Sequence, residues 1–507
     1  MSDNRKYKEE NNIWNLFREG LMVGIILLSL LCFFWKTRYS IFGAHEEYGL
    51  FYLIQKGDFF LWMNNVSKET GRITFYILSW FWGGPMFVDS PMFYRIVLAA
   101  LVLIDVLVFY RLMYVHVNKK FALFSALAVV MTFQISNQHN LLISYSYLHV
   151  AFIVLVLSTH LLLDYCKEKK GYWTVVVSAL LSFFASFFQE NFVLFYVLSF
   201  LIVYIYHEEK HLVKRFFLSL WELRFHVLGG ILFLTIYFCY RQYCGGGTYE
   251  GNSMCLTAPL TSLNVLTTFV FGMVPGRTFF ELAENIGSDQ ILIHLSKKDI
   301  VIILLEVVSV SILLYRSEKV KSWKKVIGLS AVASVLACLL HSVSVQYISW
   351  VSMGNTYAYV PSYYCCFFVN TSIFLLVNQF YHSYKGKFKY VMLGVFGISM
   401  AAFTVMSVSV NNYYTDIYRE KHFHYEAYRE YFYECDVLEW PEESQVLIVD
   451  AYDVDATAIK QSMTTVRYDA LFFTITKDKN QIDQTKPYYI IEYGEDGQLS
   501  TKYMNMK

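Results

Sequence analysis

Three consecutive residues that could take part in acid–base chemistry, His45, Glu46 and Glu47, follow the first long apolar run of the chain. A carboxylate can act as a general base by taking the proton of an attacking hydroxyl group. Positively charged residues are scarce around this cluster, although they separate apolar runs elsewhere in the sequence. We therefore take the cluster as the best guide to function. The alternative is that both glutamates are ordinary solvated residues of a loop.

A further acidic residue, Glu190, lies between two apolar runs in the sequence Gln189-Glu190-Asn191. A charge at the end of a membrane span is unfavourable unless it faces a cavity or a partner. We expect Glu190 to contact an acceptor or a sugar, or to lie beside the Glu46-Glu47 pair. A simple turn between two spans is the alternative.

Three arginines are placed where they could hold a phosphate group: Arg72, Arg241 and Arg277. A planar guanidinium can bind two oxygen atoms at once. Arg277 follows Met273-Val274-Pro275-Gly276, a turn that could direct its side chain inward. Alternatively, Arg72 pairs with Glu69 one helical turn away, and Arg241 extends its charge to the membrane interface.

The composition shows which kind of element must position these residues. The 507 residues are 56% hydrophobic, 19% aromatic and only 16% charged, which is typical of a polytopic membrane protein. Runs of sufficient length to cross, or nearly cross, a bilayer recur along the chain. They predict about eleven transmembrane helices, near Gly20–Trp35, Met92–Val115, Phe121–Ile135, Leu148–Tyr165, Tyr172–Phe188, Phe192–Tyr206, Phe225–Tyr240, Ile300–Tyr315, Val326–Leu340, Tyr363–Tyr381 and Tyr390–Val410.

The distribution of lysine and arginine predicts the orientation, because cationic loops resist translocation and stay in the cytoplasm. Each basic cluster follows an even number of predicted spans, so the clusters share one side. We expect a multi-pass protein of the cell membrane, with a cytoplasmic N-terminus, an extracytoplasmic C-terminus and an uncleaved first span. Basic clusters with this placement do not indicate nucleic-acid binding.

The loops predicted to lie outside hold most of the irregular sequence. The first covers residues 36–91, the second long one 242–299. Within the first, Asp58–Asn65 and Ile73–Trp82 are aromatic and too short to span, and Gly83-Gly84-Pro85 ends the second segment. Aromatic segments of this kind suit the headgroup layer, so we expect two helices along the outer interface. No phosphate-binding Walker loop occurs, which disfavours ATP-driven transport.

This arrangement resembles the GT-C superfamily of integral-membrane glycosyltransferases, which use a polyprenyl-phosphate-linked sugar. The resemblance lies in the acidic pair of Ala44-His45-Glu46-Glu47-Tyr48, the two interfacial helices, Gly71-Arg72 before the second of them, and an outward C-terminal domain after many spans. It implies sugar transfer, with inversion, from that donor to an extracytoplasmic glycan, lipid or protein. The family more often has Asp where this chain has Glu46 and Glu47.

The resemblance implies Glu46 or Glu47 as the general base, and cationic donors that hold the leaving phosphate. Candidate substrate-binding residues are His45, Arg72, Glu190, Arg277 and His341. The histidines show no metal-binding spacing, so no protein metal site is expected. A divalent cation bridging the donor phosphate to a glutamate is possible, since hard cations prefer such oxygen ligands.

Other polar residues have simpler predicted roles. Asp105 and Glu306 lie within predicted spans, where they could mark a proton path, but hydrogen bonding to a neighbouring helix is the favoured interpretation. Cys244 and Cys255 share an outside loop and could form a disulfide in an oxidising compartment. Free thiols are the alternative.

Residues 411–507 change character and predict a small extracytoplasmic α/β domain, separate from the transmembrane domain of residues 1–410. A tyrosine-rich helical stretch is followed by strand-like Gln445–Val449, Tyr468–Thr476 and Tyr488–Tyr493, with a helix at Ala456–Thr465. Asp450, Asp453 and Asp455 lack the glycine and distal glutamate of a calcium loop and fit a strand-to-helix turn better.

Two alternative functions stay open beside glycosyl transfer. One is a transporter or flippase of a lipid-linked saccharide, which needs polar residues along a path through both leaflets. The other is a non-catalytic envelope assembly protein whose C-terminal domain is the working part.

Overall fold

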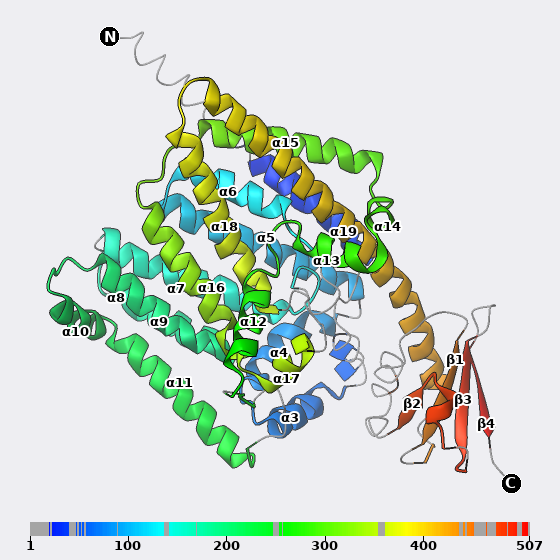
Figure 1. Ribbon diagram of the computed structural model, residues 1–507. Helices are drawn as coiled ribbons and strands as arrows, with labels where there is room; N and C mark the ends of the chain where they lie inside the picture. Colours follow the sequence, from blue (N-terminus) through cyan, green and yellow to red (C-terminus); the bar gives the residue numbers. More distant parts are fainter. Residues whose placement is uncertain are drawn as a thin grey trace, which may run out of the picture.

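The computed structural model shows a bundle of helices with a small β-sheet attached at the end of one long helix (Figure 1). The structure describes most of residues 20–504. Outside the description lie residues 1–19, 21–22, 40–46, 48–49, 52, 55–56, 89, 136–140, 169, 247–252, 256, 353–359, 435–439, 442–443, 451–462, 464–472, 484, 494–498 and 505–507. His45, Glu46, Asp453, Asp455 and the predicted helix Ala456–Thr465 therefore lie outside the described residues.

A helix forms in each apolar run that was predicted to span. These helices are Val23–Lys36, α5 Pro91–His116, α6 Lys119–Met131, α7 Ser146–Glu168, α8 Trp173–Ser186, α9 Phe195–Tyr206, α11 Arg224–Tyr243, α15 Lys297–Arg316, α16 Trp323–Ser342, α18 Val360–Ser383 and α19 Lys387–Glu434. Among the described residues, five helices are long and apolar enough to cross a membrane, or six if one bent pair forms a single span. The chain is thus an integral membrane protein with several spans, whereas the figure of eleven stays a prediction.

The bent pair contains a helix that the sequence analysis missed. Amphipathic α10, Leu212–Glu222, meets α11 at an angle of 64°. Its eleven residues include Lys214 and Arg215, so the sequence reads as a basic loop. A helix of this length has little stability of its own in water, and its apolar side must be stabilised by packing or by lipid.

Local sequence sets where the helices begin and end. The Ser90 side chain accepts a hydrogen bond from the Phe93 amide, and Pro91 takes the first helical position of α5. Asn118 caps α6 in the same way, and Ser296 forms a capping box with Asp299 at the start of α15. These caps set the residue at which each of the three helices begins.

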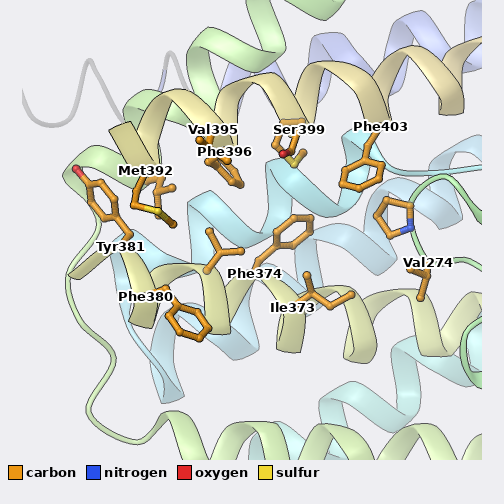
Figure 2. Close-up of a pocket in the computed structure, with 14 residues that line it drawn as sticks. Val274, Ile373, Phe374, Phe380, Tyr381, Met392, Val395, Phe396, Ser399 and Phe403 are labelled. Carbon is orange, nitrogen blue, oxygen red and sulfur yellow. The ribbon is translucent and has the colours of Figure 1, made fainter. Parts of the chain in front are cut away.

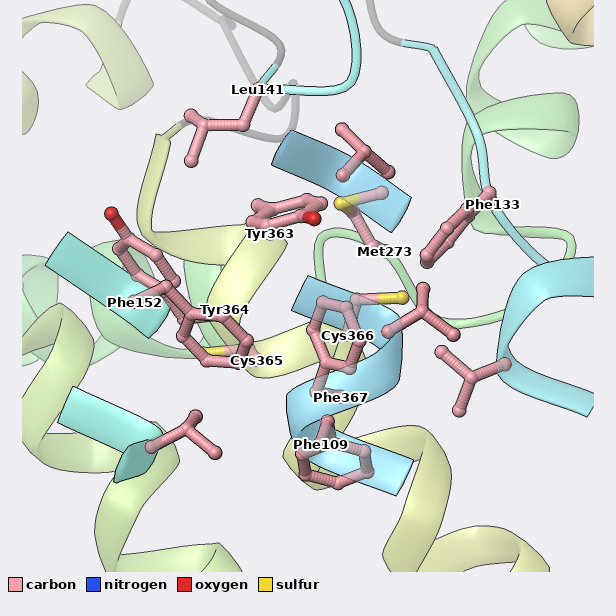
Figure 3. Close-up of a cluster of buried hydrophobic side chains, with 14 of the residues drawn as sticks. Phe109, Phe133, Leu141, Phe152, Met273, Tyr363, Tyr364, Cys365, Cys366 and Phe367 are labelled. Atoms are coloured by element: carbon pink, nitrogen blue, oxygen red, sulfur yellow. The ribbon is translucent and has the colours of Figure 1, made fainter. Parts of the chain in front are cut away.

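The core is built around aromatic side chains of α18, which face α5 and α7 (Figure 3). Phe152 of α7 stacks on Tyr364 with ring centroids 5.4 Å apart, and Phe109 of α5 lies 5.1 Å from Phe367. Such offset and edge contacts suit the ring quadrupoles and bury large apolar areas. The three helices therefore form the packed centre of the bundle.

Polar contacts also cross this core. Asp105 of α5 accepts a hydrogen bond from the Tyr363 hydroxyl at 2.8 Å and lies 2.6 Å from Nδ1 of His149 on α7. This confirms the prediction that Asp105 bonds to neighbouring helices. Glu306 lies with Lys36, Asp299 and Ser29 around a small cavity of about 50 Å³ beside α15.

Short helices occupy the predicted outer loops. The first loop holds α3 Phe59–Thr70, α4 Phe75–Gly83 and the 3₁₀ helix η2 Gly84–Phe87, as expected from its two aromatic segments. Gly71 ends α3 in the left-handed region, with φ 64°, where a side chain would be strained. The second long loop holds α12 Pro259–Val270, α13 Arg277–Ile286 and α14 Ser288–Leu292, and α17 Val345–Ser352 follows α16.

The C-terminal segment forms a four-stranded sheet in the order β2-β1-β3-β4. Its strands are β1 Gln445–Asp450, β2 Thr474–Thr476, β3 Tyr488–Tyr493 and β4 Leu499–Met504, with β1 parallel to β2 and β3, and β4 antiparallel to β3. Helix α19 passes without a break through residue 410, the predicted domain boundary. Trp440 stacks on Tyr489 of β3 with centroids 3.7 Å apart.

Candidate functional site

The central feature of the site is an ion pair between Arg72 and Glu190. Arg72 lies between α3 and α4, and Glu190 begins the 3₁₀ helix η3, Glu190–Leu194, between α8 and α9. The guanidinium donates from Nε and Nη2 to the two carboxylate oxygens, at 2.6 and 2.7 Å. Thr74, at the start of α4, donates a further hydrogen bond to Glu190 Oε1 at 2.9 Å. The first outer loop is thereby joined to the end of α8.

This pair decides between two earlier alternatives. Arg72 pairs with Glu190, so the interpretation in which it pairs with Glu69 is wrong. Glu190 is also more than a turn residue, because it holds a charged partner from a segment 118 positions away. Bidentate pairs of this kind are stronger and more directional than ordinary surface ion pairs.

The electrostatics of the pair follow from partial burial. The side chains of Arg72 and Glu190 are 18% and 19% exposed. Burial by itself would raise the pKa of Glu190, but the charge and hydrogen bonds of Arg72 outweigh it, so the pKa lies below the usual 4.5. Burial would likewise lower the Arg72 pKa, and Glu190 raises it above the ordinary value. Both groups stay charged at neutral pH.

His341, another predicted site residue, lies in the same neighbourhood. It is near the end of α16 and contacts Asn191 through Nδ1 and Gln189 through Nε2, the latter at 3.3 Å. The ring is buried and lies 5.0 Å from that of Tyr347 in α17. The sequence Gln189-Glu190-Asn191 therefore joins Arg72 on one side to His341 on the other.

Glu47, a predicted catalytic residue, is fully buried rather than solvated. Its Oε1 accepts hydrogen bonds from Trp82 Nε1 at 3.1 Å, from the Tyr145 amide at 2.6 Å and from the Tyr94 hydroxyl. Tyr145 has φ 60°, which is uncommon for a residue other than glycine. For Glu47 the solvated-loop alternative is wrong, because three donors from separate segments surround one of its oxygens.

Helix α4 relates these two carboxylates in space. Thr74 precedes the helix and contacts Glu190, whereas Trp82 lies near its end and contacts Glu47. Eight residues of α-helix span about 12 Å. The two carboxylates are therefore held at opposite ends of one short helix.

The sequence analysis did not identify several residues that support this site. Besides Trp82, Tyr94 and Tyr145, buried Arg95 donates to the carbonyl groups of Thr37 at 3.2 Å and Leu142 at 3.1 Å. Arg95 thus ties the start of the first loop to the segment that contacts Glu47. Most of these residues lie in apolar or aromatic segments and do not stand out in the sequence. Arg95 is the exception, because a charged residue inside a predicted span suggests a buried partner.

Arg277 and Arg241 lie elsewhere and have local partners. Arg277 bonds to Glu281 one turn along α13, at 2.7 Å, and to the Thr268 carbonyl at 2.8 Å. Arg241 donates to the Gly246 carbonyl at 2.9 Å. Cys244 and Cys255 are free thiols in this structure, so the disulfide considered for them is not formed.

An apolar cavity of about 330 Å³ lies between α18 and α19 (Figure 2). Ile373, Phe374 and Phe380 line it from α18, and Phe396 and Phe403 line it from α19. Val274 and Pro275, which directly precede Gly276 and Arg277, complete its wall. The cavity has the apolar character and the volume that a segment of lipid chain requires.

Comparison with solved structures gives a structural likeness. The chain is similar to the crystal structure of ArnT from Cupriavidus metallidurans bound to undecaprenyl phosphate, with a TM-score of 0.38 and 11% sequence identity, over 94% of this chain and 94% of that one. No family model matches the chain. No curated protein matches it either.

Proposed function

We propose that this protein is a membrane glycosyltransferase that moves a sugar from a polyprenyl-phosphate-linked donor to a hydroxyl group of an extracytoplasmic glycan, lipid or protein. The observation that supports this most is the Arg72–Glu190 pair. Glu190 orients the guanidinium through Nε and Nη2, while Nη1 makes no hydrogen bond to any residue that the structure describes. A guanidinium that is oriented in advance and keeps a free donor suits the leaving phosphate of such a donor.

In the proposed reaction the acceptor hydroxyl loses its proton to a carboxylate as its oxygen attacks the anomeric carbon. The bond from that carbon to the phosphate oxygen breaks, the configuration inverts, and polyprenyl phosphate leaves with the bonding electrons. Arg72 stabilises the charge that grows on the phosphate, and Glu190 acts as a positioning residue for Arg72. His341, which contacts Gln189 and Asn191 on either side of Glu190 in the sequence, is assigned to the sugar-binding side.

We assign the general base to Glu46 and a positioning role to Glu47. Three donors hold Oε1 of Glu47 in place, which suits a structural anchor. Glu46 is the other carboxylate of the acidic pair, and His45 precedes it in the same segment.

The lipid part of the donor is assigned to the apolar cavity between α18 and α19. Its wall continues along the chain into Arg277, which we propose as a second cationic contact for the phosphate or for a lipid headgroup. An isoprenoid chain has no hydrogen-bonding groups, so an apolar wall is sufficient to hold it.

The transporter alternative has less support. Deep polar groups bond to each other between helices, as Asp105 does with His149 and Tyr363, and Ser158 with Ser182 at 2.8 Å. Groups used in this way hold helices together and need no path for a solute. A non-catalytic assembly protein would also not require an oriented guanidinium.

Reconstituted protein supplied with a panel of polyprenyl-phosphate sugars tests the proposal, with release of polyprenyl phosphate as the measurement. We expect turnover with at least one donor, and loss of turnover in Glu46→Gln and Arg72→Gln. Glu318→Gln, which removes an exposed carboxylate bonded to Lys120, is the matched control for a general effect of charge. If no donor supports turnover while Glu46→Gln and Glu47→Gln behave as wild type in cells, the proposed glycosyltransferase function is refuted.

A further inference from the structure

Two histidines and an aspartate meet where the last turn of α5 packs against α7. His116 ends α5, and His160 and Asp164 lie one turn apart on α7. One ligand atom from each residue lies within 4.8 Å of the other two. Nε2 of His116 is 2.7 Å from Nδ1 of His160 and 3.5 Å from Oδ1 of Asp164. We propose that these three residues bind one divalent transition-metal ion of the zinc class.

The ligand set and its dimensions fit such an ion. Zinc binds imidazole nitrogen and carboxylate oxygen at about 2.0–2.2 Å, which places the ligands of a tetrahedral site about 3.3 Å apart. The two separations from His116 Nε2 bracket that value, and the third, between His160 and Asp164, is at most 4.8 Å, so side-chain rotations would complete the geometry. Two imidazoles favour zinc, cobalt or nickel over magnesium and calcium, which require oxygen ligands. A water molecule would take the fourth position.

Burial supplies a second, independent reason. His116 and Asp164 are 6% and 3% exposed, and His160 is half-buried. Oδ1 of Asp164 is buried and has no hydrogen bond to any described residue. A buried carboxylate oxygen that lacks a donor is unfavourable, and a cation beside it removes that penalty. The oxygen lies on the side of His116, where the ion would sit.

Two lysines limit the affinity of the site. Lys170 forms an ion pair with Oδ2 of Asp164, and Lys167 donates to the His116 carbonyl oxygen at 2.6 Å. Both ammonium groups repel a cation, so binding is weaker than at a closed structural zinc site. The Lys170 side chain is 47% exposed and can turn toward solvent when the ion binds.

The metal site is separate from the transfer site. Tyr94, near the start of α5, contacts Glu47, whereas His116 is the last residue of the same helix. Twenty-two residues of helix place the two ends about 33 Å apart. The ion would therefore clamp α5 to α7 and take no part in sugar transfer.

Metal content of the full chain, purified in detergent without a histidine tag, tests the site. We expect one zinc or cobalt ion per chain after equilibrium dialysis, and the intense visible absorption of four- or five-coordinate cobalt. His160→Gln and Asp164→Asn should lose both signals. His226→Gln, which alters a buried histidine on α11 bonded to Ser178, should keep them. No binding by wild type, or equal binding in all variants, would overturn the proposal.

Loss of metal binding in these variants could also result from misfolding, so a further variant keeps all three ligands. Lys170→Ala removes a repelling charge, so we expect zinc to bind about threefold more tightly or better. Zinc should also raise the melting temperature of wild type and Lys170→Ala but not that of Asp164→Asn. Unchanged or weaker binding by Lys170→Ala contradicts a site at Asp164.

Discussion

Removing either partner of the Arg72–Glu190 pair is expected to reduce both stability and transfer. An exposed ion pair contributes at most about 1 kcal/mol, whereas breaking a buried pair costs about 3–5 kcal/mol. Both side chains are about four-fifths buried, at 18% and 19% exposure, and the contact is bidentate. We therefore expect Arg72→Gln or Glu190→Gln alone to lower the free energy of unfolding by about 2 kcal/mol.

A double-mutant cycle isolates the pair from other effects of each substitution. Free energies of unfolding would be measured by SDS titration in mixed micelles for wild type, Arg72→Gln, Glu190→Gln and the double variant. Because the second substitution removes a partner that is already lost, the double variant should resemble the worse single variant, with a coupling energy of about 2 kcal/mol. Arg72→Lys keeps the charge but loses the two-pronged contact, and should recover little of this coupling.

Transfer measured on the same proteins separates the structural role from the catalytic one. Arg72→Lys should reduce turnover about 100-fold, in line with the removal of one oriented donor to a developing charge. Glu190→Gln should reduce it less, since Arg72 remains but is oriented less well. A coupling energy below about 0.5 kcal/mol, or full turnover in Arg72→Lys, would refute the reasoning.

Three further predictions address other groups. Because the pKa of Glu190 is below its usual 4.5, its contribution to stability is complete above about pH 5 and is lost as the pH falls through the folded-state pKa. Wild type and Glu190→Gln should therefore converge in melting temperature only once the pH has fallen below that folded-state pKa. Ser399→Trp fills the apolar cavity and should lower turnover with long-chain donors but not with short-chain analogues. Ile398→Trp, at a neighbouring position that is 74% exposed, should leave turnover with both kinds of donor unchanged. Glu47→Gln should lower stability by about 1–3 kcal/mol because three donors lose a charged acceptor, and Glu46→Gln should abolish turnover at unchanged stability; the reverse pattern would assign the base to Glu47.

The positions of the helices were predictable because apolar runs of about twenty residues carry their own signal. Each predicted run forms a helix, and the two aromatic segments of the first loop form α3 and α4. Elements that depend on partners were harder to predict. Amphipathic α10 reads as a basic loop, and β4 has little sequence signal. The change in character at residue 411 predicts a new domain there, whereas α19 runs through that position as one continuous helix.

Three residues that the structure brings together were named from the sequence, but their pairings were not. Arg72, Glu190 and His341 were each selected as polar residues at the ends of apolar runs, and the structure brings them together. That Arg72 would choose Glu190 over Glu69 depends on the packing of α4 against α7 and of η3 against α8 and α16, which sequence spacing does not report. His160 and Asp164 lie four residues apart on one helix face. Because the second residue is an aspartate, the pair does not match the two-histidine pattern of zinc proteases or the cysteine pattern of zinc ribbons.

The separation of the acidic residues bears on the chemistry itself. Enzymes that use two carboxylates on one glycosidic bond hold them about 5–9.5 Å apart, one as base or nucleophile and one as acid. Glu47 and Glu190 contact Trp82 and Thr74 at opposite ends of α4, two positions whose backbone lies about 12 Å apart along the helix, and Glu190 is already paired with Arg72. Glu190 is therefore unsuited to be the acid partner of a base near Glu47. A phosphate leaving group needs no such acid, since it departs as an anion that a guanidinium can stabilise. One carboxylate base and one oriented arginine therefore suit transfer from a phosphate-linked sugar, in which the leaving group requires no proton donor.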